Sequence, residues 1–217
     1  MKLWHKFIHP VTSHFRQKRG KYLQSKFPDM AMWRICDLGG SRHFWEKLAI
    51  ENLSTSKIII YNISDGDTQS IQPVYGNLDE IKVVIYDGKS IPACDAEFDL
   101  LVCNSVLEHV PPDQRTKLVA EMKRVAKHIF IQTPAYLFPV EPHFIMPFVH
   151  WLPRNIGYWF IHVSPWRLLS RPAPETIASY WWNTRLLSFG EIESLFPAET
   201  IYCEKVFGIT KSYYVTS

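Results

Sequence analysis

The stretch Ile35–Trp45 reads Ile-Cys-Asp-Leu-Gly-Gly-Ser-Arg-His-Phe-Trp. An apolar run ends at Asp37, breaks at Gly39 and Gly40, and continues into a helical pattern. Because glycine has no Cβ, the backbone can take positive φ values there and a ligand can approach closely. The helix that follows points its unpaired N–H groups toward such a ligand. The stretch predicts a nucleotide-type cofactor site, and an ordinary strand–helix turn is the alternative.

The same glycine pattern indicates which cofactors to exclude. A dinucleotide fingerprint needs Gly-x-Gly-x-x-Gly, and bulky Phe44 stands where its third glycine belongs. A phosphate-binding Gly-Lys-Ser/Thr loop is absent from the sequence. We therefore expect a ligand with ribose and polar groups but no pyrophosphate. Asp37, at the strand end, would repel phosphate and attract a cationic amine.

Composition indicates an ordinary protein of one domain. The chain has 217 residues and four scattered cysteines without CxxC spacing. This usage predicts a reducing, cytoplasmic setting and no zinc site. Residues 1–28 carry seven Lys/Arg and no acid, and they predict a basic helical arm. The arm is either a solvated helix packed on the domain, which we favour, or a contact for anionic lipid or an acidic substrate. A net charge of +3 is too small to predict nucleic-acid binding.

After the arm, strand and helix patterns alternate, which predicts an α/β fold with a parallel sheet and helices on both faces. The expected strands are Trp33–Leu38, Lys57–Asn62, Ile81–Tyr86, Phe98–Asn104 and His128–Gln132, followed by two closing strands at Glu199–Phe207 and Thr210–Thr216. The expected helices are Phe44–Glu51, Asp113–Ala126 and a capped helix at Ser188–Phe196.

Four polar residues fall at successive strand ends. They are Asp37, Asn62, Asp87 and Asn104. In a parallel sheet the carboxyl ends of the strands build the ligand site, so we expect these side chains to line it. Any one of them alone could cap a helix or form a turn.

Residues 134–182 differ in composition, with recurring prolines and five of the eight tryptophans. We expect an aromatic lid or substrate-binding insertion after the fifth strand. Residues 144–163 are apolar but broken by Pro147 and Pro153, which argues against a membrane span. Peripheral membrane contact at the inner face, through 1–28 and 144–163, is our second interpretation.

The order of these segments resembles the class I S-adenosylmethionine-dependent methyltransferases, most closely the type 11 group. The resemblance covers about Ile35–Gln132, and the Glu-His-Val segment at Glu108–Val110 is its most specific part. It implies a Rossmann-like sheet, mostly parallel with the last strand antiparallel, over residues 29–217. It also implies that S-adenosylmethionine is the cofactor and S-adenosylhomocysteine the product.

The resemblance also implies roles for individual residues. The first motif would wrap the methionine portion of the cofactor, and it comprises Asp37, Gly39, Gly40 and the adjoining Ser41. Asn62, with Ile63 beside it, replaces the acid that usually grips the ribose, so weaker binding is expected. Asp87 would receive the adenine amino group, with Gly88 beside the ring. Asn104 and Ser105 would lie near the methyl group.

Glu108 and His109 raise the question of a metal. Some relatives that methylate catechols or RNA ends place Glu-x-x-Glu-His here and bind a divalent ion. In this chain the first position is Ser105, so one ligand is missing and we expect no metal.

The segment Pro139–His143 suggests catalysis, because prolines on both sides of Glu141 stiffen its backbone. Methyl transfer to oxygen usually needs a base to take the hydroxyl proton. His143 is our first choice for that base and His109 the second, with Glu141 orienting the imidazole or binding the acceptor. A turn that only closes the lid is the structural alternative.

We therefore expect a methyltransferase that acts on a hydroxyl of a small molecule or of a sugar or glycan. A non-catalytic subunit with the methyltransferase fold is one alternative, because the ribose acid is absent. A nicotinamide-linked oxidoreductase is the other, and the glycine turn argues against it.

Overall fold

The computed structural model describes residues 2–48, 53, 57–63 and 81–217. Its main strands are β1 (Arg34–Leu38), β2 (Lys57–Asn62), β3 (Lys82–Ile85), β4 (Phe98–Asn104), β5 (Ala126–Pro134), β8 (Thr200–Val206) and β9 (Ile209–Thr216). Within the described ranges they form one sheet in the order β3-β2-β1-β4-β5-β9-β8. Strands β1 to β5 pair in parallel, whereas β9 is antiparallel to both β5 and β8. The predicted α/β class is confirmed.

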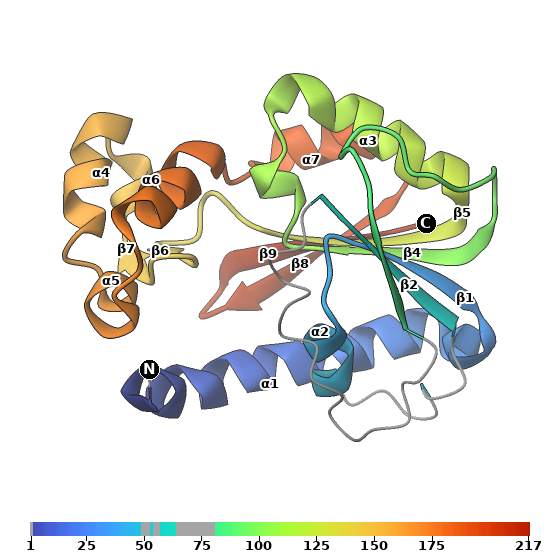
Figure 1. Ribbon diagram of the computed structural model, residues 1–217, viewed down its shortest axis with the longest axis horizontal. Helices are drawn as coiled ribbons and strands as arrows, with labels where there is room; N and C mark the ends of the chain where they lie inside the picture. Colours follow the sequence, from blue (N-terminus) through green and yellow to red (C-terminus); the bar gives the residue numbers. More distant parts are fainter. Residues whose placement is uncertain (1, 49–52, 54–56, 64–80) are drawn as a thin grey trace.

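Helices cover both faces of this sheet (Figure 1). Helices α1 (Lys2–Lys26) and α2 (Arg42–Lys47) lie on one face, and α3 (Pro112–Val125) and α7 (Phe189–Leu195) on the other. Helix α2 begins two residues earlier than predicted because Ser41 caps it. Residues 49–51 of the predicted helix lie outside the described residues.

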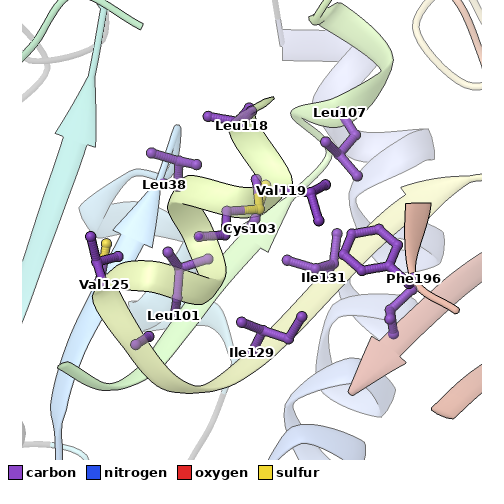
Figure 2. Packing of buried hydrophobic residues seen from close by; sticks show 14 of the residues in the cluster. Leu38, Leu101, Cys103, Leu107, Leu118, Val119, Val125, Ile129, Ile131 and Phe196 are labelled. Carbon is purple, nitrogen blue, oxygen red and sulfur yellow. The ribbon is translucent and has the colours of Figure 1, made fainter. Parts of the chain in front are cut away.

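Strand β4 shows why a continuous apolar run is needed in the middle of the sheet. Its side chains alternate between two hydrophobic clusters, with Leu101 and Cys103 on the α3 side and Leu100 and Val102 on the α1 side. All four side chains are fully buried. Figure 2 shows the α3 side, where Leu101 and Cys103 pack with Leu118, Val119 and other residues of the cluster. A strand buried on both faces positions its carboxyl end rigidly.

The segment between β5 and α7 forms a separate group of small elements, which we call the accessory lobe (residues 140–183). It comprises β6 (Val140–Glu141), β7 (Met146–Pro147), α4 (Arg154–Ile161), α5 (Pro165–Ser170) and α6 (Pro174–Asn183). The lobe has its own buried cluster of Phe144, Val149, Ile161, Ile177 and Trp181. It stands at one side of the sheet in Figure 1, and α5 contacts α1. No helix of the described residues combines the length and apolar character needed to cross a bilayer.

Candidate active site

The strand order brings the predicted polar residues to one edge of the sheet. β1 lies between β2 and β4, and Leu38 pairs with both Tyr61 and Cys103. The residues that follow these positions, including Asn62 and Asn104, therefore emerge side by side at the carboxyl ends of the strands. Such an edge, where the strand order reverses, is the usual ligand site of an open α/β sheet. We call it the cofactor edge.

The glycine turn of this edge has no space for side chains. Gly39 has a φ of +70°, and a Cβ there would lie 2.5 Å from Val106 Cγ2. A Cβ on Gly40 would lie 1.7 Å from Asp37 Oδ2. The Gly39 N–H donates to the Tyr61 carbonyl at 2.8 Å, which ties the turn to β2. Both glycines are thus required by close approach, as the sequence predicts.

Asp37 is fully buried beneath this turn. Trp45 Nε1 donates to Asp37 Oδ2 at 2.7 Å, while Asp37 Oδ1 has no partner within the described part of the chain. Burial raises the pKa of Asp37 to about 7, although the Trp45 hydrogen bond lowers it. A buried acid with one unsatisfied oxygen suits a positively charged ligand group. Trp45 was not among the predicted site residues, although it is the last residue of the Ile35–Trp45 stretch.

Asn62 and Ser41 already have protein partners. Asn62 Nδ2 donates to the Gly40 carbonyl at 3.1 Å, which leaves Asn62 Oδ1 to accept from a ribose hydroxyl. Ser41 Oγ accepts from the Phe44 N–H at 3.3 Å as the cap of α2. Both side chains therefore hold the glycine turn and its helix in place, in addition to any contact with a ligand.

Ile63 and Gly88 face one another beyond the ends of β2 and β3. Ile63 is 71% exposed, and a Cβ on Gly88 (φ +76°) would lie 3.0 Å from Ile63 Cγ2. An exposed isoleucine beside a bare backbone offers a flat apolar surface, which suits an aromatic base. Asp87 next to it is exposed, and its Oδ1 accepts from the N–H groups of Lys89 and Ser90. These backbone hydrogen bonds lower the pKa of Asp87 and keep it ionised.

The end of β4 connects to helix α1, which the sequence did not predict. Arg19 of α1 is only 8% exposed and donates to Asn104 Oδ1. Ser105 has a φ of +55°, and its Oγ donates to Gln132 Oε1 at 3.0 Å. The basic arm thus reaches the cofactor edge through one buried arginine. The sequence of the arm contains seven Lys/Arg, and nothing in it indicates which of them would contact the end of β4.

Glu141 and His143 form a hydrogen-bonded pair in the accessory lobe. His143 Nδ1 lies 2.7 Å from Glu141 Oε1, and the Phe144 N–H donates to Glu141 Oε2 at 2.7 Å. Burial lowers the pKa of His143, but the hydrogen bond and charge of Glu141 outweigh it and the net shift is upward. The carboxylate therefore fixes the orientation of the ring and leaves Nε2 for another partner.

Glu108 and His109 lie opposite that pair, in a single turn after β4 (Leu107–His109). His109 Nδ1 lies 3.1 Å from Thr184 Oγ1, and the His109 and His143 rings meet edge to face at 4.9 Å. Burial lowers the pKa of His109 to about 4, with a further contribution from the His143 charge, so the ring is neutral at pH 7. The structure brings together the three catalytic candidates His109, Glu141 and His143, with Glu108 and Thr184 beside them.

A cavity of about 480 Å³ lies beside this cluster, between the accessory lobe and α7. Glu141 and Thr184 line it together with Tyr136, Phe144 and Trp181, and Arg154 and Arg185 supply positive charge. Its volume is in the range of small-molecule sites.

Comparison with known proteins identifies the family. Residues 37–129 match a family described as a methyltransferase domain. Over these residues the chain is similar to S-adenosylmethionine-dependent methyltransferases. It is an enzyme domain, and its cofactor is S-adenosylmethionine. No curated protein matches the chain significantly.

Solved structures show the same fold. Magnesium protoporphyrin IX methyltransferase from Synechocystis PCC 6803, crystallised with S-adenosylhomocysteine, has a TM-score of 0.60 at 14% identity, covering 97% of this chain and 84% of that one. An Aquifex aeolicus methyltransferase has a TM-score of 0.55 at 13% identity, covering 91% and 88%. A putative O-methyltransferase from Nostoc punctiforme has a TM-score of 0.59 at 9% identity, covering 99% and 59%.

The residues of the cofactor edge fit S-adenosylmethionine. The unpartnered Asp37 Oδ1 suits its ammonium group, and the bare backbone of Gly39 and Gly40 allows the methionine portion to approach. Asn62 Oδ1 can accept from one ribose hydroxyl, and Asp87 Oδ2 from the adenine amino group. The bound cofactor supplies an electrophilic methyl group on a sulfonium.

Proposed function

We propose that this domain transfers the methyl group to a hydroxyl oxygen of a small molecule or sugar, including a glycan, and that His143 takes the proton. The observation that carries the proposal is the Glu141–His143 pair, in which Glu141 also lines the cavity. Glu141 holds Nδ1, so Nε2 is the ring nitrogen that can accept a proton. Base catalysis of this kind typically contributes about 10²–10⁴-fold.

The transfer balances without a further reactant. The acceptor oxygen forms a bond to the methyl carbon as the carbon–sulfur bond breaks, and the electron pair of that bond stays on sulfur. The sulfonium becomes neutral S-adenosylhomocysteine, and the hydroxyl proton moves to His143 Nε2. Positioning in line with the sulfonium contributes most of the rate, because the electrophile is already activated.

The cavity supports the choice of acceptor. Tyr136, Phe144 and Trp181 give it aromatic walls, whereas Arg185 is paired with Glu191, which also lines the cavity. An aromatic or amphipathic molecule with a hydroxyl fits this lining best. Glu141 and Thr184 place the hydroxyl end beside the two histidines.

A screen with methyl-labelled cofactor tests the proposal. Wild-type protein should label hydroxyl compounds, with the label on oxygen by mass spectrometry, and H143Q should lower kcat by at least about 100-fold. H162Q is the matched control, since His162 ends α4 outside the cluster and should leave the rate unchanged. Label on nitrogen, carbon or sulfur, or a full rate in H143Q, would contradict the proposal.

We also propose peripheral contact with the inner face of a membrane through residues 1–28 and 144–163. The supporting observation is a group of exposed apolar side chains on the accessory lobe: Trp159 is 77% exposed, Val163 60% and Phe160 50%. Aromatic side chains of this kind sit well at the level of lipid headgroups. Vesicles with anionic lipid should sediment the wild type, and the triple change to serine at these positions should abolish sedimentation. Equal sedimentation of both proteins would overturn it.

A further inference from the structure

Three side chains that can bind metal converge between the cofactor edge and the accessory lobe. Glu108, His109 and His143 each offer one ligand atom, and these atoms lie within 4.8 Å of one another. Glu108 and His109 come from the turn after β4, whereas His143 comes from the lobe, 34 residues later in the sequence. The prediction of no metal rested on Ser105, which stands where a first glutamate ligand would be, and did not include His143.

Each of the three side chains is held by a second group through the atom that a metal would not use. Thr133 Oγ1 donates to Glu108 Oε2 at 2.9 Å. Thr184 Oγ1 lies 3.1 Å from His109 Nδ1, and Glu141 Oε1 lies 2.7 Å from His143 Nδ1. This leaves Glu108 Oε1 and the Nε2 atoms of both rings available as metal ligands. Outer hydrogen bonds of this kind orient metal-binding histidines and carboxylates.

Glu108 provides independent evidence that a ligand belongs here. Its side chain is fully buried, and Glu108 Oε1 has no hydrogen-bond partner among the described residues. An unpartnered oxygen in a buried carboxylate is costly, and a bound cation would remove that cost. The Phe144 N–H occupies Glu141 Oε2, so Glu141 serves as support for His143 rather than as a fourth ligand.

We propose that Glu108, His109 and His143 form a binding site for one divalent transition-metal ion. Two imidazole nitrogens and one carboxylate oxygen suit Zn²⁺ or a similar ion, whereas Mg²⁺ and Ca²⁺ prefer oxygen ligands. Ligand atoms on one tetrahedral zinc ion lie roughly 3.3 Å apart, so small side-chain rotations close the site. Three protein ligands leave a coordination position open.

With an ion bound, His143 Nε2 is a ligand and cannot also take the proton, so the ion would replace His143 in that part of the proposed function, on which only the role of the ion rests. An acceptor hydroxyl bound at the open position would become more acidic, so its proton could pass to solvent while His143 serves as a ligand. Ion binding and oxygen methylation are measured separately, so either part can fail alone. Without an ion, His143 remains available as the base.

Calorimetric titration of Zn²⁺ into the full-length, tag-free protein, after removal of metal with a chelator, tests the site. One ion per chain should bind, and Co²⁺ should give the visible spectrum of nitrogen and oxygen ligands without thiolate charge-transfer bands. E108Q, H109Q and H143Q should each weaken Zn²⁺ binding by more than about 100-fold, and T184V by about 10–100-fold. H162Q and C94S are the matched controls, since they remove another histidine and the exposed thiol.

The outcomes separate clearly. Unchanged Zn²⁺ affinity in all three ligand variants, or no binding by the wild type, overturns the site. Loss in the ligand variants with normal S-adenosylhomocysteine binding supports it, because that binding shows that the cofactor edge is still folded. E108Q keeps an oxygen for Thr133 and matches the size of glutamate, so it tests charge and ligation with the least disturbance of packing.

Discussion

The cofactor edge and the accessory lobe are organised differently, although both contain buried acids. At the cofactor edge, Asp37 is held by Trp45, eight residues away in the same strand–turn–helix unit. In the cluster of Glu108, His109, Glu141 and His143, Glu108 is held by Thr133 and His109 by Thr184, 25 and 75 residues away. The buried acid of the cofactor edge is therefore held by local sequence, whereas Glu108 and His109 on the acceptor side are held by distant segments.

The largest expected effect comes from Gly40→Ala, which tests the cofactor edge. The new Cβ would lie 1.7 Å from Asp37 Oδ2, so the turn must move. We expect S-adenosylhomocysteine binding to fall below detection in calorimetry. Gly190→Ala is the control, because nothing lies within 4 Å of its Cβ position and its binding should match the wild type. Normal binding by the Gly40 variant would show that the turn does not contact the cofactor.

Phe144→Ala tests the independence of the lobe. Phe144 is 1% exposed in the lobe cluster, and its removal should cost about 3–5 kcal/mol of lobe stability. Alanine keeps the backbone N–H that binds Glu141, but loosening of the cluster around it should displace Glu141 and His143, so methyl transfer should be lost while S-adenosylhomocysteine affinity stays within about twofold of the wild type. Loss of both methyl transfer and S-adenosylhomocysteine binding would mean that the cofactor edge and the accessory lobe fold as one unit.

Asp37→Asn should stabilise the protein while weakening cofactor binding. The folded-state pKa of about 7 lies above the usual 3.8, so ionising Asp37 destabilises the fold as pH rises between these values. Above pH 7 the variant's free energy of unfolding should exceed that of the wild type, with an upper bound on the order of 4 kcal/mol, and below pH 4 the difference should vanish. Urea unfolding at pH 4 and pH 8 measures it. A variant advantage that shrinks with rising pH would contradict the account.

Ser188→Ala gives the smallest effect, although Ser188 is also one of the residues that line the cavity. Ser188 and Glu191 form a capping box at the start of α7, and losing it should cost about 1 kcal/mol. We expect a lower melting temperature with unchanged cofactor binding and unchanged methyl transfer. A change in turnover would instead show that α7 positions the cavity wall.

The sequence could predict the elements that local patterns encode. Strands β2 and β4 begin and end where expected, because their apolar runs are bounded by polar residues. The closing pair β8 and β9 also matches, with Gly208 at its turn. Asp37, Asn62 and Asn104 were predicted at the edge because parallel strands end together.

The remaining contacts could not be predicted because they join distant segments. Arg19 meets Asn104 only once α1 has packed on the sheet. His143 joins Glu108 and His109 only once the lobe has folded back beside β4. The prediction considered only ligands from the turn after β4 and therefore omitted His143. The bounds of strands β2 and β4 could be read from the sequence, but the docking of the insertion could not.

The most direct test of the central claim is calorimetric titration of S-adenosylhomocysteine into the wild type and Asp87→Ala, with NAD as the control ligand. Asp87 is exposed, so the change should leave the core intact. We expect micromolar binding by the wild type, at least tenfold weaker binding by the variant, and none of NAD. Equal affinity of both proteins, or binding of NAD alone, would contradict the assignment of the cofactor edge.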